Sequence, residues 1–345
     1  MNLWINNAEI VEVLAPLIKN QTPHKSLRYI HPDLKFNALP VLSLLSFLSA
    51  LQTLIFLPVV FFKILSAMSR ADHLHIRCPG NIGLIACIAQ IFFPQKNKTA
   101  KYAGNWDRNS KQPWSYNLQK WILKNEHLSK NMNVLVYGKW ENESRNIQSF
   151  YTASFSEKEK TQIEKEFTAP YRFIYVGNLV KGKGVLKAID FVVKLKKLGY
   201  NCTLKIYGGG ILEESVKEYI LKNNLSETVV VMGRKTLDEL QEAYKKAHFI
   251  ILLSKSEGWP KALAEGMWYG AISISTRVSC VPWMLGDGER GLLVDNEESN
   301  TDLGIKKMKY LLDRPEILEE MSRQSILWAQ EFSLEGFDQD IKSFL

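Results

Sequence analysis

The chain has 345 residues, which is longer than one hydrophobic core usually organises and predicts two domains of about 150 residues each. Its 46% hydrophobic and 23% charged residues exclude a disordered or fibrous chain, and its four scattered cysteines suggest neither a disulfide framework nor a zinc site. The net charge of +8 suits an anionic partner, but no nucleic-acid-binding motif is present, so no nucleic-acid partner is expected.

The start of the chain lacks the basic flank and apolar run of a secretory signal, so a cytoplasmic protein is expected. The longest apolar region, residues 36–62, contains no charged residue and is long enough to cross a membrane. Pro40 and Pro58 interrupt it, and polar residues dilute it. Three interpretations stay open: two helices of an α/β domain, peripheral contact with the inner face of the membrane, and a true span.

The rest of the first half is predicted to be α/β. Strands are expected at 71–76 and 134–137, with a helix at 82–93 between them. A basic, Trp-containing stretch follows at 102–124. The polar run 154–168 is expected to hold the domain linker or a helix leading into the second half.

From Tyr171 onward, short β-rich runs alternate with helical patterns. This alternation predicts βαβ units and a doubly wound parallel sheet, with strands at 173–176, 204–207, 229–232, 249–253 and 272–274. Glycine, serine and lysine clusters follow most of these strands. They are therefore expected to form loops at the carboxyl ends of the strands, where open α/β sheets bind ligands.

The segment after the strand 249–253 carries two glutamates, Glu257 and Glu265. We expect a helix that starts near Gly258 and points its free amides at a diphosphate. The eight-residue step separates the carboxylates by about two helical turns, so they should contact different parts of one elongated ligand with sugar hydroxyls, such as a nucleotide sugar. A helix cap at Glu257 and an exposed face at Glu265 are the alternative.

This segment resembles the donor motif of family-four retaining glycosyltransferases, a Glu-x7-Glu that begins Glu-Gly-Phe. The resemblance extends in the family order through 176–184, 206–210, 231–233 and 288–294. It implies a GT-B fold, with two Rossmann-like domains facing across a cleft and a C-terminal helix that crosses back to the first domain. The implied domains are 1–165, joined by the tail 336–345, and 166–330.

The resemblance also implies roles for individual residues. Glu257 would contact the transferred sugar, Glu265 the ribose, and Lys183 the leaving phosphates. The expected donor site is completed by the loop residues Gly258, Trp259, Pro260, Lys261, Ala262, Gly177, Asn178, Gly208, Gly233 and Arg234. A fixed cation and oriented amides would stabilise the charge of the departing nucleoside diphosphate, so no metal or other cofactor is expected.

Two positions depart from the family pattern. Asn178 stands where relatives usually carry Arg. Two outcomes stay open: weaker stabilisation of the leaving group, or a substitute cation from Lys181, Arg234 or Arg77. In the first domain the family's His-x-His becomes His75-Ile76-Arg77; His75 and Arg77 are nevertheless the expected catalytic residues there. A surface His and Arg at a strand end are the alternative.

Other functions fit the same motifs less well. Residues 177–184 nearly match a phosphate-binding loop, but Gly184 offers no hydroxyl for magnesium. A glycosyltransferase-like scaffold of a polysaccharide assembly also remains open. The expected function is retaining transfer of a sugar from a nucleotide sugar to a glycan or lipid-linked acceptor in cell-surface polysaccharide synthesis.

Overall fold

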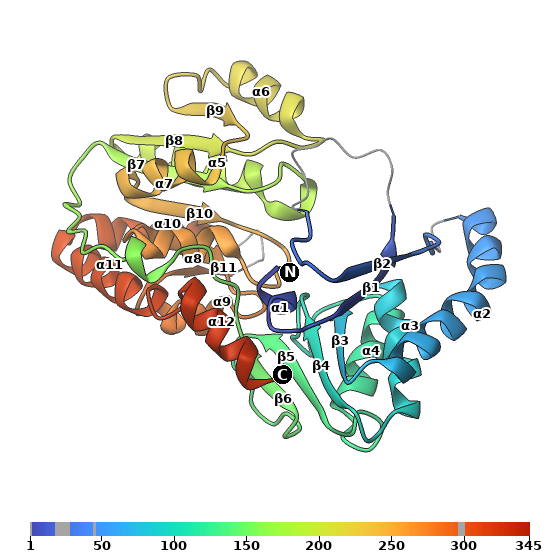
Figure 1. Ribbon diagram of the computed structural model, residues 1–345. Coiled ribbons are helices and arrows are strands. Elements are labelled where there is room, and N and C mark those ends of the chain that lie inside the picture. The colour runs from blue at the N-terminus through green and yellow to red at the C-terminus, as the bar shows by residue number, and fades with distance from the viewer. Residues whose placement is uncertain (1, 18–27, 44–45, 296–300) are drawn as a thin grey trace. The chain divides into compact units, whose positions relative to one another are not determined.

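The computed structural model describes residues 2–17, 28–43, 46–295 and 301–345. Its contacts divide the chain into two compact units (Figure 1). One comprises Met1–Phe150 with Phe337–Leu345, and the other comprises Tyr151–Gly336. The division at Phe150 lies before the boundary expected at residue 165, because Phe155 of the intervening segment is buried in the second unit, where its ring lies 5.2 Å from that of Tyr269.

The first unit is built on a four-stranded parallel sheet of order β3-β4-β5-β6, with a separate parallel pair, β1-β2. Its core lies between the sheet and helices α2, α3 and α4. Its elements are α1 (Asn2–Ile5), β1 (Val11–Pro16), β2 (Leu34–Leu39), α2 (Phe47–Arg70), β3 (His73–Cys78), α3 (Asn81–Ala89), η2 (Gln90–Phe92), β4 (Asn97–Tyr102), α4 (Trp114–Lys124), β5 (Met132–Tyr137) and β6 (Ile147–Phe150).

The predicted strands at 71–76 and 134–137 and the helix at 82–93 are confirmed as β3, β5 and α3 with η2. Strand β4 was not predicted from the sequence. This strand contains two lysines, Lys98 and Lys101, whose side chains are buried in the fold, so its sequence does not show the apolar pattern of a central strand. The Lys98 ammonium donates to the carbonyl of Phe93 at 3.0 Å, which satisfies the buried charge locally.

Residues 36–62 do not form a pair of helices, which was one of the three open interpretations. The first few belong to β2, and a single helix, α2, runs from Phe47 to Arg70. Ser46 and Ser49 form a capping box that fixes the start of α2. Pro58 lies inside the helix instead of ending it. This helix has the length and composition of a membrane span. Most of its apolar window is not buried in the fold, unlike the core helix of a soluble protein.

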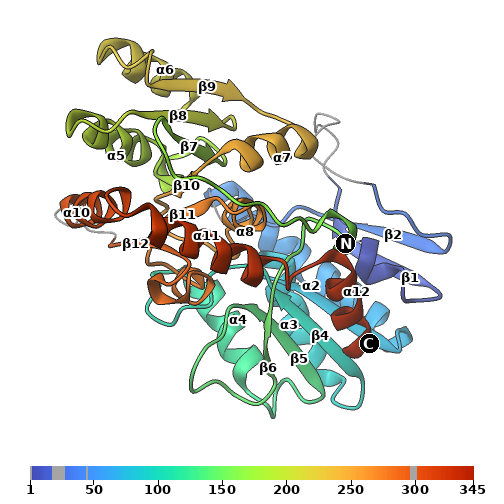
Figure 2. The ribbon, with the colours of Figure 1, turned by 90° about the vertical axis from the view of Figure 1, so that its left-hand side faces the viewer.

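The second unit is a six-stranded parallel sheet of order β12-β11-β10-β7-β8-β9 (Figure 2). Helices α5 and α10 contact each other, while α8 contacts α7 and α11. Its elements are η3 (Glu157–Glu159), β7 (Tyr171–Val176), η4 (Lys181–Lys183), α5 (Val185–Lys197), β8 (Cys202–Tyr207), α6 (Glu213–Lys222), β9 (Val229–Gly233), α7 (Leu237–Lys246), β10 (Phe249–Leu252), α8 (Lys261–Trp268), β11 (Ile272–Thr276), α9 (Val281–Met284), η5 (Gly286–Gly288), β12 (Gly291–Val294), α10 (Thr301–Leu312) and α11 (Pro315–Ala329).

Every strand predicted after Tyr171 is present, and the predicted α/β class with parallel sheets is confirmed. The expected tail helix is α12 (Leu334–Ser343). From Phe337 onward it belongs to the first unit, where the ring of Phe337 lies 5.2 Å from that of Phe150. The tail therefore returns to the first unit, as the sequence predicted.

Candidate active site

The candidate donor site lies at the carboxyl ends of neighbouring strands of the second sheet. Backbone hydrogen bonds join the loops that follow β7, β8, β9 and β10. The amide of Gly177 donates to Tyr207, that of Gly208 donates to Gly233, and that of Lys255 donates to Gly182. These bonds measure 2.8–3.0 Å, so the loops form one connected layer at the edge of the sheet.

Two glycines make this close approach feasible. Gly208 has a φ of 147°, and a Cβ there would lie 1.8 Å from the carbonyl oxygen of Gly177. Gly184 has a φ of 67°, and its Cβ would lie 2.0 Å from the carbonyl of Leu253. Any other residue would strain the backbone and collide with it at both positions. The glycine clusters therefore have a local structural reason in addition to any ligand.

Lys183 and Glu257, two of the predicted catalytic residues, form an ion pair. The Lys183 ammonium donates to both carboxylate oxygens of Glu257 at 2.7 Å. The Glu257 side chain is 4% exposed, whereas that of Lys183 is 31% exposed. A carboxylate this deeply buried needs a partner, and Lys183 supplies it. Glu257 does not cap α8, because the N-cap residue of this helix is Pro260 and no side chain caps it.

Two buried side chains, Tyr175 and Cys280, bond to the backbone of the loops that carry Lys183 and Glu257. The Tyr175 hydroxyl donates to the carbonyls of Asn178 and Lys183, which fixes the loop that carries the lysine. Burial, with a smaller contribution from the Glu257 charge, raises the pKa of Tyr175, so the hydroxyl stays neutral. Burial also raises the pKa of the Cys280 thiol to about 12, and this thiol donates to the carbonyl of Gly258.

Glu265, predicted to contact the ribose, is buried rather than on an exposed face of α8. Its two oxygens accept hydrogen bonds of 2.7 Å from the hydroxyls of Ser154 and Tyr244. Burial and the neighbouring carboxylate raise the pKa of Tyr244 well above its usual value. Each Glu265 oxygen has a second lone pair, and the Lys261 ammonium lies 3.7 Å from one of these oxygens. Ser154 and Tyr244 lie 111 and 21 residues away in the chain, and no local sequence signal identified them.

Helix α8 begins at Lys261, not near Gly258 as expected. Pro260 is not helical, with ψ of 81°, and the amide of Lys261 donates to the carbonyl of Trp259 in a tight turn. Pro260 has no amide hydrogen, so neither Pro260 nor Lys261 offers the amide that was expected to face a diphosphate. Ala262 lies in the first turn of the helix.

Trp259 points into an aromatic cluster within the second unit. Its ring centroid lies 5.9–6.5 Å from those of Tyr151, Trp283, Trp328 and Phe332. The side chain is therefore buried in the unit's own packing, where it anchors the loop that carries Glu257.

Arg234, one of the residues expected to substitute for a cation at Asn178, follows β9. Its guanidinium donates to the carbonyl of Gly209, in the loop after β8, at 3.3 Å. Arg234 therefore belongs to the same connected layer as Gly208 and Gly233.

The two first-unit residues, His75 and Arg77, lie on β3. The His75 ring stacks on Trp4 with the centroids 4.1 Å apart, and its Nδ1 lies 2.8 Å from the Thr99 hydroxyl. His73, which was not among the predicted site residues, contacts the same hydroxyl from the same face of the strand. Burial, followed by the charge of Arg77, lowers the pKa of His75 well below 6.5, so its ring is neutral. The buried Nε2 of His75 has no hydrogen-bond partner among the residues that the structure describes.

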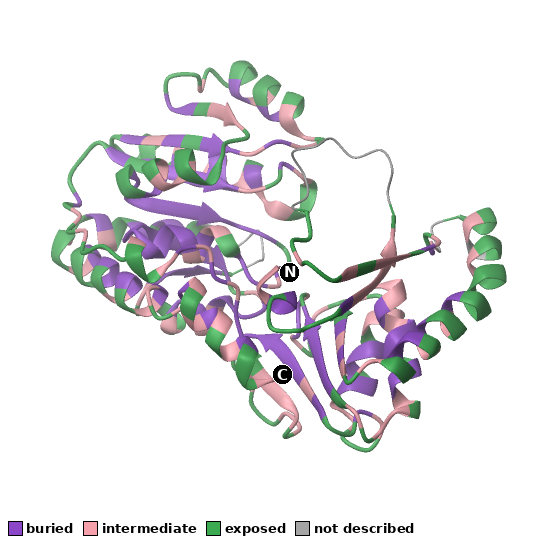
Figure 3. Cartoon of the chain, viewed as in Figure 1, coloured by how far each residue is buried: buried purple, intermediate pink, exposed green. Residues whose placement is uncertain are grey.

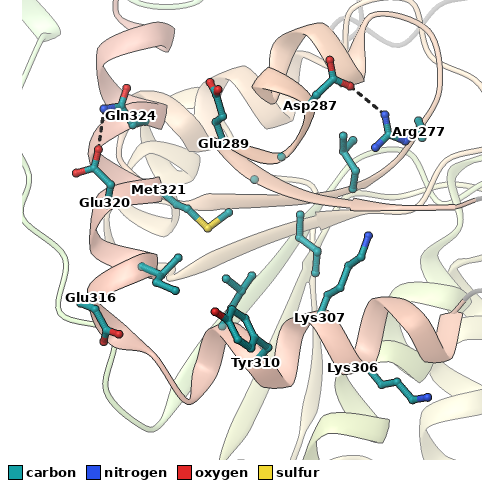
Figure 4. A pocket seen from close by; sticks show the side chains of 16 residues that line it. Arg277, Asp287, Glu289, Lys306, Lys307, Tyr310, Glu316, Glu320, Met321 and Gln324 are labelled. Carbon is teal, nitrogen blue, oxygen red and sulfur yellow. Dashed lines mark hydrogen bonds and ion pairs between the residues drawn. The ribbon is translucent and has the colours of Figure 1, made fainter.

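A separate hollow of about 1000 Å³ lies beside the edge strand β12 (Figure 4). Lys306, Lys307 and Tyr310 of α10 line it on one side, and Arg277 pairs with Asp287 at its rim. Residues 288, 289 and 291–293 of the segment that contributed to the resemblance line part of it, but neither Lys183 nor Glu257 does. This hollow is therefore distinct from the candidate donor site.

Within the described ranges, no three His, Cys, Asp or Glu side chains are grouped so that they could hold a metal ion. Cationic groups near the candidate donor site include the side chains of Lys183, Arg234 and Lys261, the last of which lies 3.7 Å from a Glu265 oxygen.

Residues 156–328, half of the chain, match the family described as "Glycosyl transferases group 1". The chain belongs to this family. It is 32% identical over 166 residues to an uncharacterized glycosyltransferase from Methanocaldococcus jannaschii, covering 48% of this chain and 45% of the relative. It is 29% identical over 143 residues to the amylovoran biosynthesis glycosyltransferase AmsK from Erwinia amylovora, covering 40% of this chain and 35% of the relative. The chain thus spans less than half the length of these relatives.

Solved glycosyltransferases share the fold over most of the chain. Sucrose-phosphate synthase from Thermosynechococcus elongatus aligns with a TM-score of 0.68 and 15% identity, over 96% of this chain and 87% of the other. HepE from Anabaena, in complex with UDP and glucose, aligns with a TM-score of 0.65 and 13% identity, over 90% and 85%. At these identities the similarity establishes the GT-B fold with its two Rossmann-like domains.

Proposed function

We propose that this group 1 glycosyltransferase moves a sugar, with retained anomeric configuration, from a nucleotide diphosphate sugar to a glycan or lipid-linked acceptor. The observation that carries the proposal is the Lys183–Glu257 ion pair on the connected glycine-rich loops. An anion-binding cation and a hydroxyl-binding carboxylate in direct contact match the two chemical parts of such a donor, its diphosphate and its sugar.

In the proposed complex, the donor separates Lys183 from Glu257 and becomes the partner of both. Lys183 turns its ammonium toward the diphosphate, and Glu257 accepts hydrogen bonds from the sugar hydroxyls. Arg234 contributes the second positive charge, and Glu265 accepts from the ribose at its free acceptor positions. These charges replace a metal ion, because the charge that develops on the leaving phosphates is stabilised by fixed cations.

In the proposed reaction, the acceptor oxygen forms a bond to the anomeric carbon while the bond from that carbon to the phosphate oxygen breaks. The acceptor proton passes to the leaving phosphate, so the products are the glycoside and the nucleoside diphosphate. Front-face attack of this kind is what the resemblance to retaining transferases implies. Glu257 and Glu265 are engaged by Lys183, Ser154 and Tyr244, which supports binding roles for them instead of nucleophilic attack.

We assign the acceptor side to His75 and Arg77. Neutral His75, with its buried Nε2 unpartnered among the described residues, is suited to one hydrogen bond with a neutral hydroxyl. Arg77 is exposed and suits an anionic group of the acceptor. The name of AmsK supports a role in polysaccharide synthesis. We place the reaction in the cytoplasm, at the inner face of the membrane.

A panel of nucleotide sugars, tested first for thermal stabilisation and then for transfer, examines the proposal. A donor that binds the folded protein raises its melting temperature with concentration. Glu257→Gln preserves the shape of the side chain, and we expect it to lower transfer by about 100-fold or more, since charged contacts to the reacting sugar are worth about 3 kcal/mol. Lys255→Gln, in the same loop, is the matched control.

The alternative is a glycosyltransferase-like scaffold without transfer activity, and the loss of the family's arginine at Asn178 is what favours it. Stabilisation by a nucleotide sugar with no detectable transfer to any glycan or lipid acceptor would support the scaffold. Transfer that survives in Glu257→Gln at the wild-type rate would exclude the proposed site.

A further inference from the structure

The first turns of α2 are apolar and exposed on every side. In residues 47–59, which we call the α2 tip, Phe47 is 84% exposed, Leu48 72% and Leu54 67%. Figure 3 shows these outer turns in the colour of exposed residues. The remaining large apolar side chains that are exposed in the α2 tip are Leu51, Ile55, Phe56, Leu57 and Val59.

The direction of these side chains distinguishes between the surfaces that could cover them. Successive residues of an α-helix are turned by about 100°, so the four consecutive residues 54–57 point to all sides of the helix. All four are exposed. A partner helix or a second copy of the chain would cover one stripe of the α2 tip and leave the other sides in water. A helix that is apolar all round is suited to an apolar medium.

The polar groups of the α2 tip are largely satisfied within the chain. Ser46 and Ser49 bond each other and the first amides of the helix through the capping box. The Thr53 hydroxyl donates to the Ser43 carbonyl and accepts from the Ser43 amide, both at 2.9 Å. The exposed Gln52 amide is the main remaining polar cost, because the other polar groups named here keep partners when the tip enters hydrocarbon.

The second half of α2 sets a limit to the depth. Val60, Ile64 and Met68 are buried in the core of the first unit, so this half cannot enter lipid without unfolding. The α2 tip has 13 residues, about 20 Å of helix, whereas the hydrocarbon core of a bilayer is about 30 Å thick. The tip can reach into one leaflet but cannot span both.

We propose that the α2 tip inserts into one leaflet of a membrane that contains anionic lipid. Lys35 and Lys63 are exposed and bound the uncharged stretch, and the chain carries a net charge of +8, which complements anionic headgroups. The proposal replaces the broad region 36–62 with a defined segment. It does not depend on the proposed transferase activity, because its test measures lipid binding.

Flotation of the full chain with vesicles tests the insertion. Vesicles with anionic phosphatidylglycerol should bind the protein more tightly than vesicles of phosphatidylcholine alone. The double variant Leu54→Ser/Ile55→Ser should lower the partition coefficient by about 10- to 100-fold, since each large apolar side chain contributes about tenfold when it is buried. Leu198→Ser/Leu221→Ser, which changes two exposed leucines of the second unit, is the matched control and should bind as the wild type does.

An environment-sensitive dye on single introduced cysteines tests the depth. The four native cysteines are buried, so labelling selects the new one. On adding vesicles, dyes at Leu48→Cys and Ile55→Cys should shift strongly to the blue, and a dye at Ser69→Cys should not. Equal responses at all three positions would overturn the proposal. So would binding that survives Leu54→Ser/Ile55→Ser and disappears at high salt, or a vesicle-free dimer that the same variant makes monomeric.

Discussion

The two parallel sheets position their candidate site residues differently. In the second unit, the loops after β7 and β8 are rich in glycine, backbone hydrogen bonds join them and the loop after β10 into one layer, and Lys183 and Glu257 of these loops form an ion pair. In the first unit, His75 lies within β3, where side-chain packing between Trp4 and Thr99 fixes its ring, and the ring is neutral. A backbone layer thus fixes the loops of the candidate donor site, while side-chain packing fixes His75, which we propose for the acceptor side.

The difference also explains where the family similarity lies. Glycine loops tolerate few substitutions because a Cβ at Gly208 or Gly184 would meet backbone atoms within about 2 Å. The matched segment, residues 156–328, falls within the second unit. The packing around β3 uses ordinary side chains that others can replace.

The largest effect is expected for Gly208→Ala, which attacks the backbone layer directly. The new Cβ would collide with the Gly177 carbonyl, and we expect the free energy of unfolding to fall by about 3 kcal/mol or more. Urea unfolding measures it. Gly182→Ala, in the neighbouring loop, is the control, since a Cβ there meets no atom within 4 Å. Equal losses in both variants would mean that the layer does not depend on close contact.

A smaller loss of stability is expected for Lys183→Met, which leaves Glu257 buried without its cation. Because the lysine is partly exposed, we expect a loss of about 1–3 kcal/mol in the free energy of unfolding. Adding Glu257→Gln to this variant should recover part of it. Lys181→Met, at an exposed position of the same turn, should change the stability by less than about 0.5 kcal/mol. A double variant as unstable as the sum of the single ones would deny the coupling.

The smallest effect concerns pH. Burial, with help from Arg172 and Lys165, lowers the pKa of His248 in the second unit to about 4, from 6.5. The unfolded chain therefore takes up this proton first as the pH falls, and stability should decrease between pH 6.5 and 4. After solvent screening we expect about 1–2 kcal/mol. His248→Asn should flatten this limb of the stability curve, and His75→Asn should flatten it by a similar route in the first unit. Unchanged curves in both variants would contradict the buried neutral rings.

Much of the second unit could be predicted because its signals are local. Strand and helix periods, and glycines after the strands, are properties of consecutive residues, and all the strands predicted there are present. The first unit was harder because β4 carries buried lysines and because Pro58 does not end α2. Charged residues usually indicate an exposed segment and proline usually ends a helix, so neither element could be predicted from its own residues.

The sequence by itself determined the α/β class, the group 1 glycosyltransferase family and the segments that carry Lys183, Glu257 and Glu265. Only the tertiary structure decided the partners of these side chains: Lys183 for Glu257, Ser154 and Tyr244 for Glu265, and an aromatic cluster for Trp259. It also decided that the first half of α2 is exposed on all sides and the second half buried. Periodicity fixes the direction of a side chain relative to its own element, but partners and burial depend on segments that lie far away in the chain.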